Sequence, residues 1–266
     1  MNKSQIISVI NQKGGVGKTT TVINLATALT LHKKKVLVID LDPQGNATTG
    51  LGLSNYDNSK TIYDLLNGNC SVEDSIKDTK IDNLKLISSN VDLSGLEVET
   101  ASENRRAFLL KDKIDSFINS PNNDFAYILI DCPPSLSLLT VMSLVIAKSI
   151  IVPLQAEFFA LEGLSQLMKT IDRIKIKLNP ELQVRGVLLT MFDKRNKLSG
   201  EVDKEARKYF EEKVYQTVIP RNVRLSEAPS HGVPVLIYDK TCSGSQSYLS
   251  FAEEFLKQEN VMESAA

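Results

Sequence analysis

A glycine-rich segment near the start of the chain, NQKGGVGKTT at residues 11–20, carries the residue types needed to bind phosphate. Glycines let backbone N–H groups close around phosphate oxygens, and the start of a following helix adds a partial positive charge. Lys18 can reach the β- and γ-phosphates of a nucleotide, and the Thr19 hydroxyl can ligate Mg²⁺. An apolar run precedes the segment and a helical pattern follows it, which is the context that a phosphate-binding loop requires. The residues predicted to bind the nucleotide here are Lys13, Gly14, Gly15, Val16, Gly17, Lys18, Thr19 and Thr20.

The loop departs from the common pattern G-x-x-x-x-G-K-[ST] in two ways. Gln12 stands where that pattern has its first glycine, and a second lysine, Lys13, follows it directly. The site therefore carries two cations, Lys13 and Lys18, where an ordinary loop of this kind carries one. The form K-G-G-x-G-K-[ST] resembles the deviant Walker A motif of the ParA/MinD class of P-loop ATPases. That resemblance implies that Lys13 reaches across a dimer interface to the nucleotide of the partner subunit.

Acidic residues at the ends of two apolar runs could complete a site for phosphoryl transfer. Asp40 and Asp42 follow the run at 36–39, and they can share a face because alternate residues of an extended segment point the same way. Asp131 ends the run at 127–130 in the Walker B form, and would hold Mg²⁺ through water because Mg²⁺ keeps several of its waters. From the residues alone, these carboxylates could instead be solvated turn acids or helix caps.

The string DLDPQGN at residues 40–46 resembles the second motif of the ParA group. The resemblance implies that Asp42 orients or activates the attacking water and that Asp40 lies near the magnesium shell. With Lys13 and Lys18, Asp42 then forms the predicted catalytic set, and Thr19, Asp40 and Asp131 form the predicted metal set. Such a set suits phosphoryl transfer, which needs a held water, a metal and cations on the developing charge.

Short apolar runs alternate with helical patterns along the chain, which predicts an α/β fold. Runs without polar alternation indicate strands covered on both faces, so we expect a mostly parallel sheet with helices on both faces. Together with the loop, this predicts a P-loop NTPase, and the resemblance to the ParA/MinD class implies the SIMIBI type. Each predicted chemical residue falls at the carboxyl end of a strand, where ligands bind in such sheets. Predicted strands span 5–10, 36–40, 84–87, 127–131, 149–153 and 186–190, and predicted helices span 18–31, 103–119, 136–147, 160–178, 200–212 and 245–258.

The chain of 266 residues has an ordinary globular composition, 42% hydrophobic and 24% charged. Since no linker-like segment is evident, we expect a single domain over 1–266, with a core at about 5–257, an irregular excursion at 54–82 and a frayed tail at 259–266. Three scattered cysteines without a C-x-x-C pattern disfavour a metal or iron–sulfur site. The chain is expected to be cytoplasmic, because it shows neither a signal peptide nor an apolar stretch of about 20 residues that could span a bilayer.

The segment PRNVRLSEAPSHG at residues 220–232 has no chemical meaning that spacing alone supplies. It resembles the chromosomal ParA (Soj) proteins and, with the motifs DCPPS at 131–135 and LTMFD at 189–193, extends the resemblance over about residues 5–257. The resemblance implies that Pro220 and Asn222 contact adenine, and that Arg195 and Arg224 contact duplex DNA without sequence preference. Net charge is −1, so from composition alone a mixed solvated surface is the alternative to a basic DNA-binding strip. The neighbouring cations that could join such a strip are Lys194, Lys197, Arg207, Lys208 and Arg221.

The resemblance implies a nucleoid-associated partition ATPase that uses ATP and Mg²⁺. In this family ATP drives formation of a homodimer, the homodimer binds DNA, and a ParB-type protein stimulates hydrolysis and release. A MinD-type membrane ATPase is the alternative, but it needs a basic amphipathic C-terminal helix, and residues 248–259 carry three glutamates and one lysine. We therefore expect no membrane partner. An iron–sulfur relative is disfavoured by the cysteine pattern, and a synthetase would need a substrate pocket that the sequence does not identify.

Overall fold

The computed structural model describes residues 4–53, 60–121, 123–157 and 159–264, with side chains described as far as Glu259. This part of the chain forms one seven-stranded sheet in the order β3-β4-β2-β5-β1-β6-β7. All neighbouring strands are parallel except β3, which pairs antiparallel with β4 at one edge. The strands are β1 (Gln5–Val9), β2 (Val36–Asp40), β3 (Ile76–Asp78), β4 (Leu84–Ile87), β5 (Tyr127–Asp131), β6 (Ser149–Gln155) and β7 (Gln183–Thr190).

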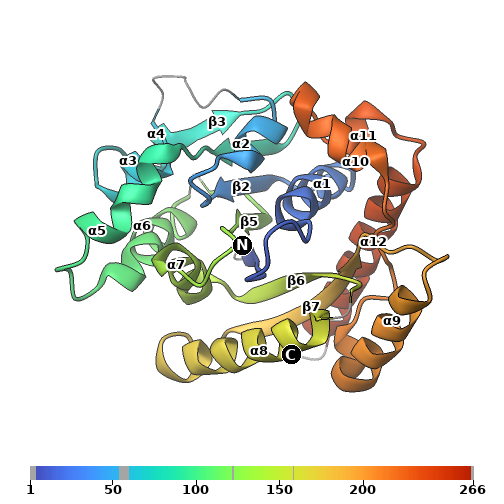
Figure 1. The fold of residues 1–266 in the computed structure, drawn as a ribbon. Coiled ribbons are helices and arrows are strands. Elements are labelled where there is room, and N and C mark those ends of the chain that lie inside the picture. The colour runs from blue at the N-terminus through green and yellow to red at the C-terminus, as the bar shows by residue number, and fades with distance from the viewer. Residues whose placement is uncertain (1–3, 54–59, 122, 158, 265–266) are drawn as a thin grey trace.

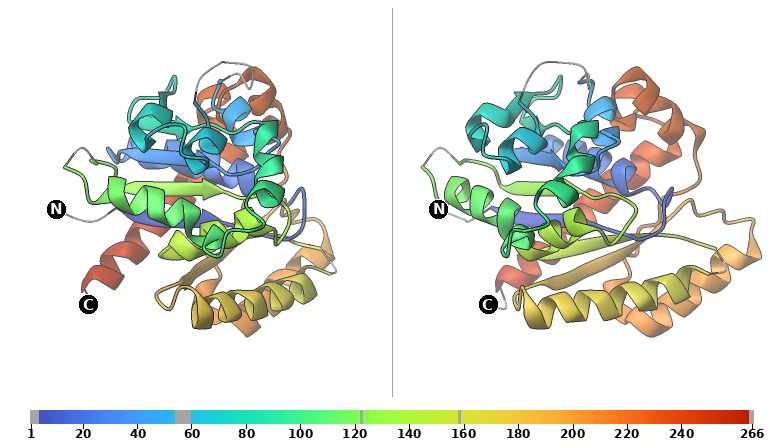
Figure 2. Two further views of the ribbon diagram at one scale, coloured as in Figure 1. Left: turned by 90° about the vertical axis from the view of Figure 1, so that its left-hand side faces the viewer. Right: turned by 60° about the vertical axis from the view of Figure 1, so that its left-hand side comes forward.

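Helices cover both faces of the sheet, as Figures 1 and 2 show. One face packs against α1 and α12 through a cluster that includes Leu25, Tyr248 and Phe251. The other face packs against α6, α7 and α8 through residues such as Ile114 and Leu164. The predicted α/β architecture, a mostly parallel sheet with helices on both faces, is confirmed. As expected for strands covered on both faces, β2 and β5 are buried along their whole length. The longer helices are α1 (Lys18–Leu31), α6 (Leu109–Ile118), α7 (Leu138–Ile146), α8 (Ala160–Lys177), α9 (Lys197–Phe210) and α12 (Ser243–Ser264).

The register of the central strands brings their acidic ends together. In β1 and β5, Val9 lies opposite Asp131, and in β2 and β5, Asp40 lies opposite the same residue. The phosphate-binding loop follows β1 directly, so the loop and both carboxylates meet at one edge of the sheet. The expected gathering of the chemical residues at the carboxyl ends of the strands is therefore confirmed for these elements.

The segment 54–82, predicted as irregular, contains ordered elements in the part that the structure describes. Helix α3 buries Ile62 and Leu65 completely, and it begins with a capping box in which Thr61 and Asp64 exchange hydrogen bonds. The prediction failed here because four- and five-residue helices show too little periodicity to detect, although the Thr-x-x-Asp spacing was a usable signal. Residues 54–59 lie outside the described part. The short elements of the chain are α2 (Asn46–Gly50), α3 (Ile62–Leu66), α4 (Val72–Ser75), η1 (Val91–Gly95), α5 (Leu96–Glu99), η2 (Arg106–Phe108), η3 (Glu211–Lys213), α10 (Val223–Glu227), η4 (Ala228–His231) and α11 (Val235–Tyr238).

The C-terminal helix α12 starts at Ser243 and continues to Ser264, beyond the predicted end at 258. Tyr248, Phe251 and Phe255 are almost completely buried, and Phe251 meets Tyr215 edge-to-face with ring centroids 4.7 Å apart. The apolar stripe of the helix thus faces the sheet. The described part of the chain contains no helix that is long and apolar enough to cross a bilayer.

Candidate functional site

The phosphate-binding loop has the backbone geometry that its glycines make possible. Gly15 and Gly17 have φ values of 74° and 89°, a left-handed region that other residues rarely adopt, and Gly17 caps the start of α1. The hydroxyl of Thr190, at the end of β7, donates a 2.8 Å hydrogen bond to the Val16 carbonyl and braces the loop from outside. The loop borders a cavity of about 360 Å³. Among the residues lining this cavity are Gly14, Gly15, Gly17, Lys18, Thr19, Thr20, Asp42 and Pro134.

The two lysines of the loop take different positions. Lys18 is buried and lines the cavity, and its ammonium group donates a 3.1 Å hydrogen bond to the Lys13 carbonyl. Burial lowers the pKa of Lys18, although the nearby carboxyl group of Asp131 opposes that shift. Lys13 does not line the cavity, and its half-exposed side chain forms an ion pair with Glu157. One cation therefore points at the cavity and the other points away from it.

Glu157 was not predicted as a site residue, although it follows β6 at the same edge of the sheet. A second contact reinforces its pairing with Lys13: the Asn11 side chain accepts from the Lys13 backbone N–H at 3.0 Å and donates to the Pro153 carbonyl at 2.8 Å. The start of the loop is thus fastened to the end of β6. The signal that could have identified Glu157 is its position after a strand end, the rule that identified the aspartates.

Asp131 is completely buried, and neither of its carboxylate oxygens has a hydrogen-bond partner among the described residues. Burial raises its pKa well above the ordinary value, and the neighbouring Asp40 raises it further, while the Thr19 hydroxyl opposes the shift. Two buried carboxylates side by side, one of them with both oxygens unpartnered, attract a cation strongly. These residues therefore fit Mg²⁺, with Thr19 and water completing an oxygen shell. No group of three or more Cys, His, Asp or Glu side chains with metal-binding geometry occurs in the described part of the chain, so protein carboxylates alone would not fill that shell.

Asp40 and Asp42 have separate environments. Asp40 is fully buried behind the cavity and accepts hydrogen bonds from the backbone N–H and the hydroxyl of Thr48 at 2.8 and 2.7 Å. Burial raises the pKa of Asp40 to about 6 against the effect of these hydrogen bonds. Asp42 lines the cavity and accepts from the Gln44 backbone N–H at 3.0 Å, in a turn that ends at the left-handed Gly45. Asp42 is thus the aspartate of this motif positioned to meet a group inside the cavity, and Asp40 is a buried neighbour.

Cys132, next to Asp131, is a packed thiol rather than a nucleophile. It is buried, contacts the Ser143 hydroxyl at 3.1 Å, and has a pKa that burial raises to about 12.

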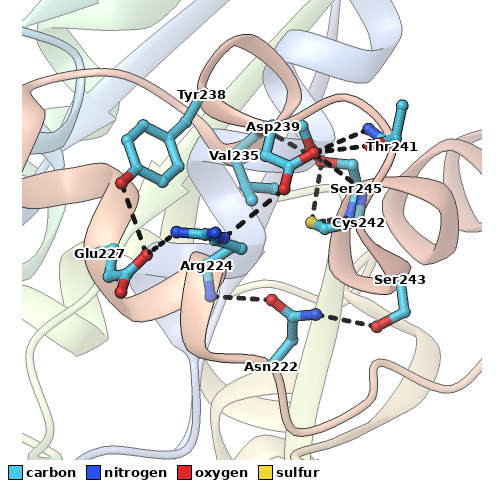
Figure 3. Close-up of polar contacts among 10 residues, drawn as sticks. All are labelled: Asn222, Arg224, Glu227, Val235, Tyr238, Asp239, Thr241, Cys242, Ser243 and Ser245. Carbon is cyan, nitrogen blue, oxygen red and sulfur yellow. Dashed lines mark hydrogen bonds and ion pairs between the residues drawn. The ribbon is translucent and has the colours of Figure 1, made fainter.

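A second cavity, of about 250 Å³, adjoins the first, and the two share five lining residues: Gly17, Thr20, Met191, Leu225 and Pro229. Pro220 and Asn222 line the second cavity, so the structure places both predicted adenine contacts next to the loop. The Asn222 side chain caps α10 by accepting from the Arg224 backbone N–H at 2.8 Å, and it donates to the Ser243 hydroxyl at 2.9 Å (Figure 3). These bonds fix the wall of a pocket large enough for part of a small planar ligand.

The two predicted DNA-binding arginines lie on the surface and are paired with acids of their own chain. Arg195 forms two parallel hydrogen bonds to Asp193, at 3.0 and 2.9 Å, with its side chain 90% exposed. Arg224 donates to Glu227 at 2.8 Å and lies 3.6 Å from Asp239 (Figure 3).

Not every cation of the predicted basic strip is available to a partner. Arg207 is occupied by Asp203 at 2.7 Å and by the carbonyls of Val214 and Tyr215 at 3.3 and 3.0 Å. Its hydrogen bonds hold the end of α9 to the following segment, so its role here is structural.

The residues after α2, the helix that follows the turn of Asp42, contact the residues after η4, which follows the helix that carries Arg224. Gly52 and Gly232 both have positive φ values, 82° and 64°, and their backbones touch. A Cβ atom built on Gly52 would lie 2.7 Å from the Gly232 carbonyl oxygen.

Comparison with known proteins agrees with this geometry. A family model described as an AAA domain matches residues 4–184. The chain is 51% identical over 258 residues to the chromosome partitioning protein ParA of Caulobacter vibrioides, covering 97% of this chain and 96% of that protein. It is 48% identical over 250 residues to the sporulation initiation inhibitor protein Soj of Bacillus subtilis, covering 94% and 97%.

Two solved structures extend the comparison. Cobyrinic acid a,c-diamide synthase of Mycobacterium smegmatis with bound ADP and magnesium superimposes with a TM-score of 0.83 and 32% identity, covering 97% of this chain and 96% of that one. The septum site-determining protein MinD of Pyrococcus horikoshii, complexed with Mg-ADP, gives a TM-score of 0.78 and 26% identity, covering 97% and 98%.

Proposed function

This chain belongs to the ParA/Soj family of chromosome-partitioning ATPases, and on that premise we propose that ATP switches it from a monomer to a DNA-binding homodimer. The observation that supports the switch is the divergence of the two loop lysines. Lys18 lines the cavity beside the loop, whereas Lys13 lies outside it and is held by Glu157. A lysine that does not line its own cavity is suited to serve the nucleotide of a second subunit.

The residues of the cavity suggest how hydrolysis proceeds. Lys18 and the loop N–H groups bind the β- and γ-phosphates. Thr19, Asp131 and the nearby Asp40 would hold Mg²⁺, which would neutralise charge on the phosphates when bound. Asp42 orients a water against the γ-phosphorus. As the oxygen of that water bonds to phosphorus, the bond to the bridging oxygen breaks, the water gives up a proton to solvent, and ADP and phosphate leave. Lys13 of the partner subunit stabilises the charge that develops in this step.

The second cavity is the proposed adenine site, with Pro220 and Asn222 in its wall. Its connection to the first cavity through Gly17 and Thr20 lets one nucleotide occupy both, with the base in one and the phosphates in the other. We assign residues 1–266 to one ATPase domain on this basis, because the two cavities draw on segments from both ends of the sequence.

Sequence-independent DNA binding is proposed for Arg195 and Arg224. With a net charge of −1, the chain has no global field that would attract DNA, so local cations must supply the affinity. A two-fold dimer doubles the number of phosphate contacts, which makes binding depend on ATP. We further propose that a ParB-type protein stimulates hydrolysis and thereby releases the protein from nucleoid DNA in the cytoplasm.

The membrane alternative has less support. A MinD-type reading needs an apolar helix face that is free to enter lipid, but Tyr248, Phe251 and Phe255 of α12 are buried against the sheet.

Sedimentation velocity tests the proposal with ADP, with ATP, and with ATP plus a random-sequence duplex. We expect a monomer with ADP, a dimer with ATP and a DNA-bound dimer in the third sample. Lys13→Ala should bind ATP and remain monomeric, which separates a role between subunits from a role in the loop's own nucleotide site. A Lys13→Ala protein that still dimerises with ATP would refute the proposed switch.

A further inference from the structure

A third hollow, separate from the two nucleotide cavities, lies between the loop after β7 and the start of α12. Its volume is about 530 Å³. It opens beside Arg195, which makes it continuous with the surface proposed for DNA. The residues that line it are Phe192, Asp193, Lys194, Arg195, Val218, Pro220, Arg221, Ser243 and Ser247.

The charges of this hollow favour an anion. Three cations face one carboxylate, Asp193, and that carboxylate is already matched by its two hydrogen bonds from Arg195. These bonds, and more weakly the charge of Arg221, lower the pKa of Asp193 to about 2. In the part of the chain that the structure describes, Lys194 and Arg221 have no carboxylate within 4 Å. Their charges, with the Ser247 hydroxyl beside them, are left for a partner.

The frame that holds Arg221 is fastened by backbone hydrogen bonds. The Arg221 N–H donates to the Phe192 carbonyl at 3.1 Å, the Phe192 N–H donates to the Ile219 carbonyl at 3.0 Å, and the Ile219 N–H donates to the Leu189 carbonyl at 2.8 Å. The Asn222 side chain adds a bond to Ser243 at the start of α12 (Figure 3). These bonds fix the backbone from which the Arg221 side chain extends, and a guanidinium can bind a phosphate with two parallel hydrogen bonds.

Arg221 also occupies a distinctive position between two sites. Pro220 and Arg221 line both this hollow and the 250 Å³ cavity proposed for adenine. A base bound in the adenine cavity would therefore lie on the other side of the wall that carries Arg221.

We propose that the hollow seats a backbone phosphate of duplex DNA and that Arg221 is its principal cation, assisted by Lys194. This assignment rests on the DNA binding proposed above and deepens it. Phosphate chemistry is favoured over a protein carboxylate because the hollow adjoins Arg195 on the same surface, which is the surface proposed for DNA. The contact carries no sequence information, since it reaches no base edge.

Fluorescence anisotropy with a random-sequence duplex, saturating ATP and a salt series tests the proposal. Each phosphate contact contributes about −0.9 to the slope of log K against log salt, so Arg221→Gln should reduce the slope by roughly 1.8 in a dimer. At 0.1 M salt, counterion release alone then predicts roughly 60-fold weaker binding. Lys194→Gln should change the slope in the same direction, and Arg221→Lys should retain it because the charge is kept.

Arg173→Gln is the matched control, because Arg173 is an exposed arginine on α8 outside the hollow. ATP affinity and ATP-dependent sedimentation are measured on each variant. They show whether weaker DNA binding results from weaker ATP binding or dimerisation, or from the loss of the phosphate contact itself. A wild-type slope in Arg221→Gln, in a wild-type protein that does bind DNA, overturns the phosphate seat and leaves the proposed function standing. Wild-type protein that does not bind DNA with ATP overturns both.

Inorganic phosphate distinguishes the source of the ligand. Added at constant ionic strength, it should compete no better than chloride if the seat requires a duplex. Specific competition that disappears in Arg221→Gln would assign the hollow to free phosphate and overturn the assignment to DNA.

Discussion

Replacing Glu157 with glutamine should strengthen ATP-dependent dimerisation. In the structure Glu157 holds the ammonium group of Lys13, and the proposed dimer requires that group to reach the partner's nucleotide. The side chains of Lys13 and Glu157 are 51% and 32% exposed, so solvent screens their attraction. Pairs with this exposure contribute about 0.2–1 kcal/mol.

A dimer must break two such pairs, which together cost roughly 0.4–2 kcal/mol. Glu157→Gln removes this cost, and the dimer dissociation constant should fall roughly 2- to 30-fold. Sedimentation over a protein concentration series with ATP would measure the change, in an Asp42→Ala background that prevents hydrolysis from depleting the dimer. Glu162→Gln, an exposed acid in the first turn of α8, is the control for lost charge alone.

A double-mutant cycle tests whether Glu157 acts on dimerisation through Lys13. If Glu157 acts by restraining Lys13, its replacement should have no effect once Lys13 is alanine. Weaker dimerisation in Glu157→Gln would show that Glu157 instead makes a favourable contact in the dimer, and an equal effect in both backgrounds would show that the Lys13 pair is not its route.

Four further changes test the rest of the site. Lys18→Ala should weaken ATP binding roughly 10- to 150-fold in calorimetry, since hydrogen bonds to charged groups contribute about 1.5–3 kcal/mol, and affinity within a fewfold of wild type would contradict the phosphate-loop assignment. Asp42→Ala should bind ATP, dimerise and accumulate on DNA without hydrolysis, whereas normal single-turnover hydrolysis would show that another group positions the water. Arg195→Glu and Arg224→Glu should each abolish DNA binding in gel shifts while ATP-dependent dimerisation persists, and tight binding by the ADP form would argue for a surface independent of the switch. Burial raises the folded-state pKa of Asp131, so without Mg²⁺ the contribution of this group to stability should fall as pH rises above about 4. In urea denaturation the stability of the wild-type protein relative to Asp131→Asn should therefore fall between about pH 5 and pH 8, and the same pH dependence in both proteins would refute the raised pKa.

Local signals explain which parts of the fold could be predicted. Helix α1 begins at Lys18 and ends at Leu31 as expected, because a glycine loop with a left-handed cap and an apolar pattern are encoded in adjacent residues. The buried strands were recognisable for the same reason: continuous apolar runs ending in an aspartate are local features. Helix α9 begins at Lys197 rather than near 200, because the Asn196 side chain caps it by accepting from the Leu198 N–H at 3.0 Å.

Pairings between distant segments could not be predicted in this way. Lys13 and Glu157 are far apart in the sequence. They are neighbours only because β1 and β6, the strands that precede them, pair in the sheet. The same holds for Arg207. Its place in a charged segment predicted a surface cation available to DNA, but in the structure its guanidinium donates to the carbonyls of Val214 and Tyr215. Which cations remain available is thus a property of tertiary packing rather than of charge count.

The contact between Gly52 and Gly232 ties together two loops that are far apart in the sequence. Because a side chain on Gly52 would collide with the Gly232 carbonyl, the two backbones stay in contact only while both positions lack a Cβ atom. The short helix α2, which follows the turn of Asp42, therefore rests directly on the segment that leads back to Arg224. A displacement of α2 would therefore be passed to this segment as one backbone moving against another, with no side chain of either glycine between them.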